Sequence, residues 1–338
     1  MQKKIRVAQV GMGHDHANVT YGSLCKLSDD YEVVGLAEPV EMHRGRLHSD
    51  PLYQGAKLYT VEELLDMELD AVAIECDEEY ATRYAQLFAD RGVAVHMDKP
   101  GSPGAASFEK LARTLEEQHL PFQLGYMYRY NPVIQKAFAY VKEGKLGDIL
   151  SVEAHMSVRH SVEKRNWLGK YPGGMLYYLG CHLIDLIYQL QGEPMHVLPL
   201  NQPAGFDGVT AEDQGMVLLQ YPGGTSFARS SAVEYNGFER RQLVISGTKG
   251  TIEIKPLEKY LDTDPAGTMR TYASFTNYEN EKTPWRDCAE KWSCEPFDRY
   301  DAMMGDFAAM VRGEKENPYS YDYEIRLFRL IMRCCHGE

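Results

Sequence analysis

The first third of the chain alternates short apolar segments with segments in which apolar residues recur every three to four positions. Short apolar segments are typical of strands buried on both faces, and the recurring pattern is typical of helices that cover a sheet. We predict strands at residues 5–10, 32–37, 70–74, 93–97 and 121–124, and helices at residues 14–27, 61–65, 79–91 and 108–118. Thr60 and Glu63 have the spacing of a capping box at the second of these helices. The alternation predicts βαβ units and a parallel sheet.

After Gly125 the pattern changes to longer segments in which apolar and polar residues alternate. Alternation indicates strands with one buried face, and tight glycine turns between neighbours favour antiparallel pairing. We predict strands at residues 149–158, 215–221, 225–233, 241–246 and 251–255, and helices at residues 132–143, 175–191, 300–311 and 322–334. Residues 262–282 are polar and rich in Gly, Pro and Asn, which predicts a long loop. The fold class is therefore α/β over residues 1–122, followed by an α+β domain with an open, mainly antiparallel sheet over residues 123–338.

Composition narrows the range of partners. The 36 basic and 49 acidic residues give a net charge of −13, which argues against nucleic acid and against an anionic membrane surface. No apolar run approaches the roughly 18 residues of a membrane span, and the basic start of the chain leads into a strand and not into a signal peptide. The seven cysteines form no CxxC pair, so we expect free thiols and a cytoplasmic protein.

The first chemical signal is a glycine turn between a strand and a helix. Gly11, Met12, Gly13, His14 and His16 form a GxGxxH pattern. Glycines at a helix N-terminus let a pyrophosphate approach backbone N–H groups, so the turn predicts dinucleotide binding. Glu38 follows the next strand, where an acidic side chain binds a ribose 2′-hydroxyl and repels a 2′-phosphate; this favours NAD over NADP. The alternative is a tight turn without a ligand.

The spacing of His14 and His16 also raises the question of a metal. With no third ligand evident in the glycine turn, we predict no metal site.

Two further motifs carry candidate chemistry. Asp98-Lys99-Pro100 follows a predicted strand, and in a doubly wound sheet such strand ends face the ligand crevice. Lys99 is suited to polarising an oxygen, although a lysine at a strand end is also a common solvated charge. Later, the pair Gly173-Gly174 opens a predicted helix on which Tyr178 and His182 are four residues apart and share a face. A histidine is the usual proton acceptor near neutral pH, although a buried histidine can also be purely structural.

In this order the motifs resemble the Gfo/Idh/MocA family of NAD(P)-dependent oxidoreductases, whose members include inositol dehydrogenases. The resemblance also takes in Arg129-Tyr130-Asn131-Pro132 and Gly247-Thr248-Lys249-Gly250-Thr251. It implies an NAD(P)-binding Rossmann domain over residues 1–122 and a substrate-binding and oligomerisation domain over residues 123–338. It also implies hydride transfer between a nicotinamide and a secondary hydroxyl or carbonyl of a sugar, polyol or related compound, with Lys99 and His182 beside the reacting carbon.

The chain departs from the family pattern at three places. Asp98 replaces the usual Glu before the lysine, and Tyr178 replaces an Asp that many members carry four residues before the histidine. Glu75-Cys76 stands where many members have Thr-Pro-Asn against the cofactor, and its negative charge again favours NAD.

The predicted site residues follow from the motifs and the resemblance. The catalytic residues are Lys99, His182 and Tyr178; the cofactor-binding residues are Gly11, Met12, Gly13, His14, His16, Glu38, Glu75, Cys76, Asp98 and Lys99; the substrate contacts are Arg129, Arg159, His160, Trp167, Tyr178 and His182. Two other functions stay open: an NAD-dependent glycoside hydrolase that acts by transient oxidation, and a catalytically silent cofactor-binding sensor. An open sheet with an uncovered face predicts a homodimer or homotetramer.

Overall fold

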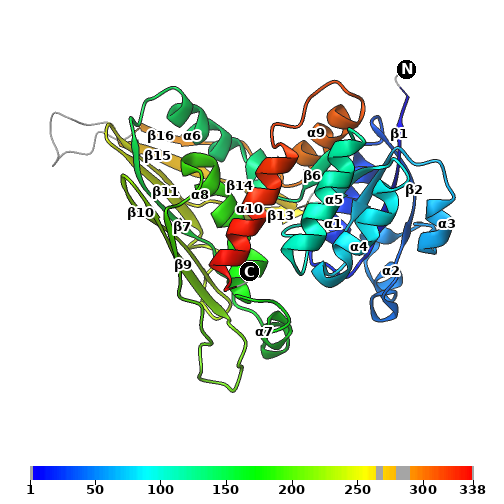
Figure 1. Cartoon of the computed structure of the whole chain (residues 1–338), viewed down its shortest axis with the longest axis horizontal. Helices are drawn as coiled ribbons and strands as arrows, with labels where there is room; N and C mark the ends of the chain where they lie inside the picture. Colours follow the sequence, from blue (N-terminus) through cyan, green and yellow to red (C-terminus); the bar gives the residue numbers. More distant parts are fainter. Residues whose placement is uncertain (1–2, 264–268, 279–289, 337–338) are drawn as a thin grey trace. The chain divides into compact units, whose positions relative to one another are not determined.

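The computed structural model describes residues 3–263, 269–278 and 290–336. The chain forms two compact units (Figure 1). The first comprises residues 1–127, 262–270 and 298–328, and the second comprises residues 128–261, 271–297 and 329–338. The sequence analysis gave one boundary near residue 122, whereas residues 298–328 pack in the first unit.

A parallel sheet of six strands forms the centre of the first unit. Its order is β3-β2-β1-β4-β5-β6, the doubly wound order in which the two halves of the sheet diverge between β1 and β4. The strands are β1 (Ile5–Val10), β2 (Tyr31–Ala37), β3 (Leu58–Tyr59), β4 (Ala71–Ile74), β5 (Ala94–Met97) and β6 (Phe122–Leu124). Every residue of β4 and β5 is buried, because both faces of the sheet are covered.

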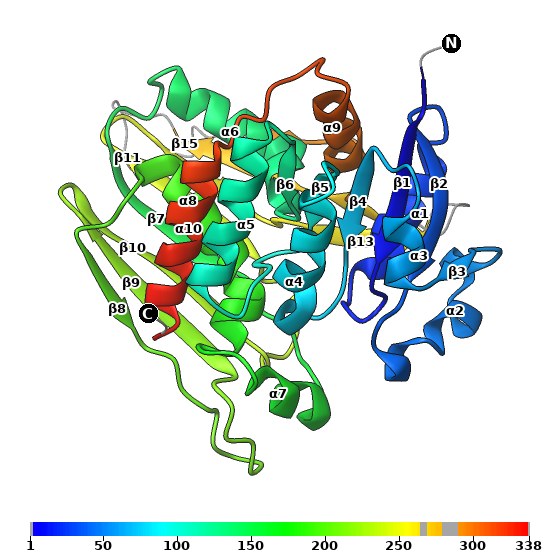
Figure 2. The same cartoon turned by 45° about the vertical axis from the view of Figure 1, so that its right-hand side comes forward.

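The first unit contains the four predicted helices α1 (Ala17–Lys26), α3 (Val61–Leu65), α4 (Glu78–Ala89) and α5 (Ala105–Glu117). It also contains three short helices that were not predicted: η1 (Glu41–His43), α2 (Arg46–Ser49) and η2 (Pro51–Tyr53). The capping box at α3 is confirmed: the Glu63 N–H donates to Thr60 Oγ1 at 3.1 Å, and the Thr60 N–H donates to Glu63 Oε2 at 2.7 Å. Figure 2 shows α4 beside the sheet, and Gln86 on α4 donates to Thr114 on α5 at 2.9 Å.

The late segment of the first unit adds one whole helix and the first part of a second to the Rossmann-type sheet and its helices. Tyr31 on β2 donates its hydroxyl proton to the carbonyl of Met304 on α9 (Asp301–Val311) at 2.6 Å. The ring of Phe108 on α5 stacks on Phe328 of α10 (Tyr321–Cys334) with centroids 4.4 Å apart. The two helices were predicted from periodicity, but their packing on this sheet was not.

A mainly antiparallel sheet of eight strands dominates the second unit. Its order is β16-β15-β12-β11-β7-β10-β9-β8, with β7 and β10 as a parallel pair. The strands are β7 (Ile149–His155), β8 (His196–Pro199), β9 (Gln214–Tyr221), β10 (Gly224–Ser231), β11 (Gln242–Gly247), β12 (Thr251–Ile254), β15 (Ser274–Tyr278) and β16 (Glu290–Ser293). The open, mainly antiparallel sheet predicted from the sequence is confirmed.

The helices of the second unit are η3 (Met127–Tyr130), which begins in the first unit, α6 (Pro132–Lys142), α7 (Val162–Leu168), the π-helix η4 (Leu176–Gly180) and α8 (Cys181–Gln191). Of these, α6, η4 and α8 pack against strands of the large sheet. Figures 1 and 2 show α6 and α8 along one face, while no described helix covers the opposite face, called the open face below. Residues of β9 and β10 alternate accordingly between fully and partly buried.

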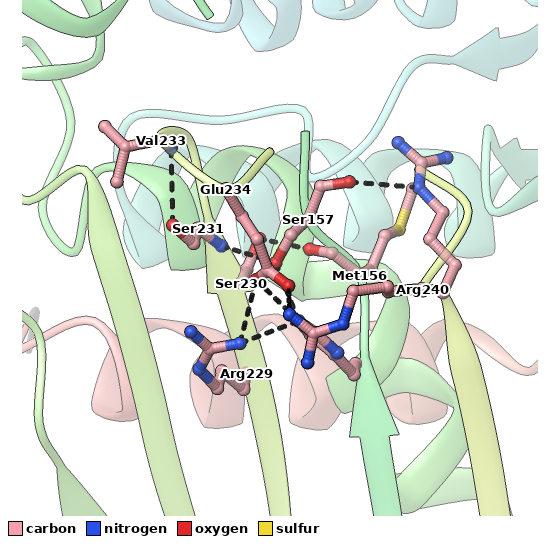
Figure 3. Close-up of polar contacts among 10 residues, drawn as sticks. Met156, Ser157, Arg229, Ser230, Ser231, Val233, Glu234 and Arg240 are labelled. Atoms are coloured by element: carbon pink, nitrogen blue, oxygen red, sulfur yellow. Dashed lines mark hydrogen bonds and ion pairs between the residues drawn. The ribbon is translucent and has the colours of Figure 1, made fainter. Parts of the chain in front are cut away.

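A polar cluster occupies one end of the open face (Figure 3). Glu234 accepts hydrogen bonds from Arg240 and, at 2.9 Å, from Arg229 Nη1. His155 Nε2 lies 3.1 Å from Glu234 Oε2 and 2.9 Å from Ser157 Oγ. Burial lowers the pKa of His155, and Arg229 adds to this effect, so the ring is a neutral member of the cluster near pH 7.

The long loop predicted at residues 262–282 is wrong where the structure describes it. A third sheet of order β13-β14-β17 uses β13 (Lys259–Thr263), β14 (Met269–Tyr272) and β17 (Phe297–Asp298), and β15 also falls in the predicted loop. The rest of that loop lies outside the described residues. Among the described residues, no helix combines the length and the apolar character that crossing a membrane requires. The six described cysteines are free thiols, and Cys288 lies outside the described residues.

Candidate active site

Four strand ends of the first unit bring the predicted cofactor residues together. The glycine turn follows β1, Glu38 follows β2, Glu75 and Cys76 follow β4, and Asp98 and Lys99 follow β5. These strands are neighbours in the sheet, so their carboxyl ends form one continuous edge. The His14 N–H donates to the Glu75 carbonyl at 3.2 Å, which joins the turn to the end of β4.

Gly11 is required by the close approach of the chain after β4. Its φ is +99°, a conformation that disfavours residues with a side chain. A Cβ at this position would overlap the backbone of Cys76. The structure of the first unit thus requires a glycine at position 11, whether or not the turn binds a ligand.

Helix α1 begins at Ala17 without a capping side chain. The residue at its N-cap, His16, makes no side-chain hydrogen bond to the first turn. An uncapped helix N-terminus beside a glycine turn fits an anionic group, because its first N–H groups lack side-chain acceptors and the helix dipole favours negative charge. The residues present therefore fit a dinucleotide pyrophosphate.

Glu38 is turned toward the glycine turn. Its carboxylate accepts hydrogen bonds from the Met12 N–H and, at 2.7 Å, from the Val40 N–H. Burial raises the pKa of Glu38, while these two backbone donors oppose the shift. The carboxylate also borders a pocket of about 450 Å³ that is shared with Arg44, Tyr59 and Arg83.

A buried charge network lies between the glycine turn and the end of β5. His14 Nε2 is 2.7 Å from Asp98 Oδ2 and 3.6 Å from Glu78 Oε1. Burial works against protonation of His14, but the interactions with Asp98 and Glu78 outweigh it and raise its pKa to about 10. Lys99 is fully buried in the same unit, and its charge helps hold the pKa of Asp98 well below the usual range despite burial.

The pKa of His16, two residues further along the chain, is shifted in the opposite direction. Burial lowers the pKa of His16 to about 4, and the charge of Lys99 contributes to this shift. At this pKa the His16 ring is neutral near pH 7. Its Nδ1 lies 4.0 Å from Oδ1 of Asp98, the carboxylate that is paired with His14.

The sequence analysis found no third group near the two histidines, and the structure corrects this point. Potential ligand atoms of His14, His16 and Asp98 lie within 4.8 Å of one another. The short distance between His14 and Asp98 is that of an ion pair, which by itself accounts for the cluster.

Sequence reasoning missed several members of this network. Glu78, the first residue of α4, contacts His14, and His96 on β5 lies 3.6 Å from Glu75 through Nε2. His96 Nδ1 also lies 2.8 Å from Gln123 on β6. A histidine and a glutamine inside otherwise apolar strands were the available signal, because buried polar side chains need partners.

In the second unit, His182 and Tyr178 lie on different types of helix. Tyr178 belongs to the π-helix η4, and His182 is the second residue of α8. Both side chains are buried; the His182 ring lies 5.4 Å from that of Tyr128, and the Tyr178 ring lies 5.5 Å from that of Trp167. The helix predicted at residues 175–191 is confirmed as a continuous helical segment whose first part is π-helical, and π-helical turns are frequent at functional sites.

The glycine pair before η4 accommodates the chain itself. Gly174 has a φ of +42°, and a Cβ there would overlap the carbonyl oxygen of Glu212. A Cβ on Gly173 would lie 2.6 Å from Cβ of Cys335. These two glycines therefore make room for protein atoms of the same unit.

Arg129 has a partner that the sequence analysis did not assign. Its guanidinium donates to both carboxylate oxygens of Asp185 on α8, at 2.8 Å from Nη2 to Oδ1 and 3.1 Å from Nε to Oδ2. Both side chains are buried. These contacts give Arg129 a structural role in holding α8, whereas contact with a substrate stays a prediction.

The other predicted substrate residues gather around Tyr178. The His160 ring is 6.4 Å from the Tyr178 ring, and the ammonium group of Lys164 lies over the rings of both Trp167 and Tyr178. Lys164 was missed from the sequence. Arg159 lies next to His160 and stacks on the ring of Tyr235 at 3.8 Å.

The fold and the site together define a class of protein. A doubly wound parallel sheet with a glycine turn after β1 and an acidic residue after β2 is a Rossmann-type nucleotide-binding arrangement. Residues 134–253 match the model of the GFO/IDH/MocA C-terminal domain. Residues 134–253 are thus similar to the C-terminal domain of the Gfo/Idh/MocA oxidoreductases, the family that the sequence motifs resemble.

Individual proteins agree with this resemblance. An uncharacterized oxidoreductase of Escherichia coli is 28% identical over 46% of this chain and 47% of its own length. D-xylose 1-dehydrogenase (NADP(+)) 2 of Haloferax volcanii is 25% identical over 79% of this chain and 78% of its own length. The WlbA dehydrogenase of Bordetella pertussis, solved with NADH and UDP-GlcNAcA, has the same fold, with a TM-score of 0.78 at 18% identity over 99% of this chain and 96% of that chain. Against several curated relatives the matched region spans only about half of the relative's length.

Proposed function

We propose that this protein is an NAD-dependent dehydrogenase or reductase that acts on a secondary hydroxyl or carbonyl of a sugar, polyol or related compound. The observation that carries the proposal is the fully buried Lys99 at the end of β5, in the same unit as the glycine turn and its uncapped helix. Lysine side chains are seldom fully buried, because removing the charge from water is costly, so a buried lysine indicates a specific role. The relatives named above include dehydrogenases of sugar-like compounds, which supports the substrate class.

The proposed roles follow from the chemistry of the side chains. Lys99 donates a hydrogen bond to the reacting oxygen and stabilises negative charge on it; it also holds the nicotinamide ribose. His182 accepts the hydroxyl proton during oxidation and returns it during reduction. Tyr178 orients His182 or replaces it as the proton carrier. NAD, when bound, accepts the hydride from the substrate carbon.

The preference for NAD rests on the carboxylate of Glu38 at the predicted ribose position. Glu38 lies against the glycine turn, so a 2′-phosphate on a ribose bound there would meet negative charge. We expect NAD and NADH to raise the melting temperature of the protein more than NADP at equal concentration. Glu38→Ala should narrow that difference, and a clear preference of the wild type for NADP would refute the assignment. Arg44 and Arg83, which border the same pocket, are the residues to examine in that case.

The catalytic assignment is tested by substitution of the two central residues. Oxyanion-type donors contribute roughly 10²–10³ in rate, and a general base contributes about 10²–10⁴. Lys99→Ala and His182→Ala should each abolish most NADH formation in a screen of sugars, inositols and sugar acids. Calorimetry should show an unchanged affinity for NAD in His182→Ala and a weakened but detectable one in Lys99→Ala, because the glycine turn is intact in both variants. Wild-type turnover in both variants would show that the chemistry lies elsewhere.

Tyr178→Phe separates the two roles of the tyrosine. If Tyr178 only orients His182, the loss of turnover is modest and the acidic limb of the pH–rate profile still follows the histidine. If Tyr178 carries the proton, the loss matches that of His182→Ala. Product analysis keeps the glycosidase alternative distinct, because that reaction regenerates its NAD and yields no net NADH.

A further inference from the structure

The second unit contains a pocket that the proposed catalytic roles do not use. Its volume is about 440 Å³. It is bordered by the residues after β7, by α7, by the segment between β8 and β9, and by the residues after β10. The residues that matter for the argument are Arg159, His160, Arg165, Phe206, Asp207 and Tyr235.

The two arginines of the pocket differ in whether a carboxylate pairs with them. Arg165 is buried between two carboxylates: it forms an ion pair with Asp207 and donates to Asp213 at 2.8 Å. Arg159 is exposed and forms no ion pair with any carboxylate in the described part of the chain; its guanidinium instead stacks on Tyr235. The pocket therefore presents one positive charge that pairs with no carboxylate of the described residues and that stacks on an aromatic ring.

Two large aromatic rings at the same pocket are left in solvent. Tyr235 is 73% exposed and Phe206 is 71% exposed, the latter with the guanidinium of Arg165 5.6 Å from its ring. Exposed aromatic side chains around a concave polar site are typical of surfaces that bind a ligand. Their faces can cover the apolar face of a ring-shaped molecule, while the arginine binds a charged substituent.

The pocket is connected to the predicted catalytic residues through one of its walls. His160 borders the pocket, and its ring faces that of Tyr178 edge-on with a centroid distance of 6.4 Å. A substrate whose reacting carbon lies near Tyr178 would thus extend its remote end into the pocket. This step rests on the proposed function.

We infer that this pocket selects substrates that carry an oxyanion, a carboxylate or a phosphate, on a sugar-like ring. Arg159 binds the oxyanion through paired N–H donors, the geometry that a guanidinium offers to both groups. Phe206 and Tyr235 pack against the ring. Specificity for acidic over neutral sugars would then come from Arg159, at a position separate from Lys99 and His182.

The test measures binding and turnover separately. Calorimetry on the full chain with NAD present uses glucuronate as the carboxylate probe, glucose 6-phosphate as the phosphate probe and glucose as the neutral control. We expect at least one acidic probe to bind more tightly than glucose. Arg159→Gln should weaken binding of that probe by about 10–100-fold and leave the affinity for glucose unchanged, since hydrogen bonds to charged groups have this magnitude. Tyr235→Leu, which removes the stacking partner of Arg159, should weaken binding of the same probe.

Arg333→Gln is the matched control, because Arg333 is also an exposed arginine of the second unit, pairs with Glu193 and does not border the pocket. It should behave as wild type. Equal affinity of the wild type for all three probes, no binding of any probe, or unchanged binding in Arg159→Gln would each overturn the inference. Turnover distinguishes this failure from that of the proposed function: binding that depends on Arg159 without NADH formation from any sugar refutes the dehydrogenase and keeps the oxyanion pocket.

Discussion

Two histidines of the glycine turn have opposite pKa shifts, although they are only two residues apart. The ion pair with Asp98 raises the pKa of His14 to about 10, whereas burial lowers that of His16 to about 4. The surrounding charged groups are Glu78 and Lys99, so the network holds two positive and two negative charges when His16 is neutral. His14 and His16, which belong to the predicted cofactor turn, therefore make the stability of the protein depend on pH.

The sign of this coupling follows from where each proton is bound. Above pH 6.5 the unfolded chain loses the His14 proton while the folded chain keeps it, so stability falls as pH rises from 6.5 toward 10. Below pH 6.5 the unfolded chain protonates His16 while the folded chain does not, so stability falls as pH decreases from 6.5 toward 4. We expect the two histidines to give maximum stability near pH 6.5, with a slope of at most about 1.4 kcal/mol per pH unit for each proton.

Denaturant unfolding of the protein without ligand from pH 5 to 9 measures these slopes. His14→Asn should lower stability overall, because Asp98 loses its partner, and should flatten the alkaline limb. His16→Asn should reduce the acidic limb without abolishing it, since burial also lowers the pKa of His155. His48→Asn, a change on the exposed face of α2, is the control and should keep both limbs. Unchanged limbs in both turn variants would contradict the assignment of these protons.

Single residues also show where sequence reasoning reaches its limit. The cofactor residues were found because the glycine turn and the strand ends are local signals that a parallel sheet brings to one edge. The partner of Arg129 was not found, because Asp185 is 56 positions away and only the folded second unit places it there. A charged residue in a motif can therefore be a buried structural group as readily as a substrate contact.

At the scale of elements, prediction succeeded where short-range rules determine the structure. The capping box at α3 involves only Thr60, Glu63 and their backbone, so four residues of sequence contain it. Five of the six strands of the parallel sheet were found, because burial on both faces leaves nearly continuous apolar segments. The sixth, β3, has only two residues, neither of them fully buried, and was missed. Periodicity likewise found α9 and α10.

Features that depend on tertiary contacts, such as the π-helical form of η4, were missed. The π-helix η4 begins after Gly173 and Gly174, where Cys335 and Glu212 approach the backbone, and a Cβ on Gly215 would press on Leu176 within it. No local pattern contains these contacts. The strands β13, β14 and β15 are polar and short, so composition predicted a loop where pairing between distant segments forms sheets.

At the scale of the whole molecule, the open face of the large sheet is the main unexplained surface. Leu198 on β8, Leu218 on β9 and Phe227 on β10 are paired directly across neighbouring strands. Leu198 is 54% exposed, and the other two are partly buried. An apolar row on an uncovered sheet is typical of a surface that binds a partner.

The polar cluster at the end of the open face borders this apolar row on one side (Figure 3). Met216, Arg229 and His155 form the next cross-strand row, and Glu234 joins the last two. An apolar centre with a charged border is the usual anatomy of a protein interface. We therefore expect two copies of the chain to pack through their open faces, as a homodimer or within a homotetramer.

Light scattering after size exclusion at micromolar concentration tests this expectation. The wild type should have the mass of two or four chains, since a stable interface buries about 1,600 Å² and the sheet offers a broad surface. Leu218→Glu places a charge in the middle of the apolar row and should shift the protein toward the monomer, because a carboxylate buried at the interface would lack a partner. Met42→Glu changes a methionine that is 82% exposed in the first unit and should leave the mass unchanged. A monomeric wild type, or a Leu218→Glu protein that still assembles, would show that the open face has another role.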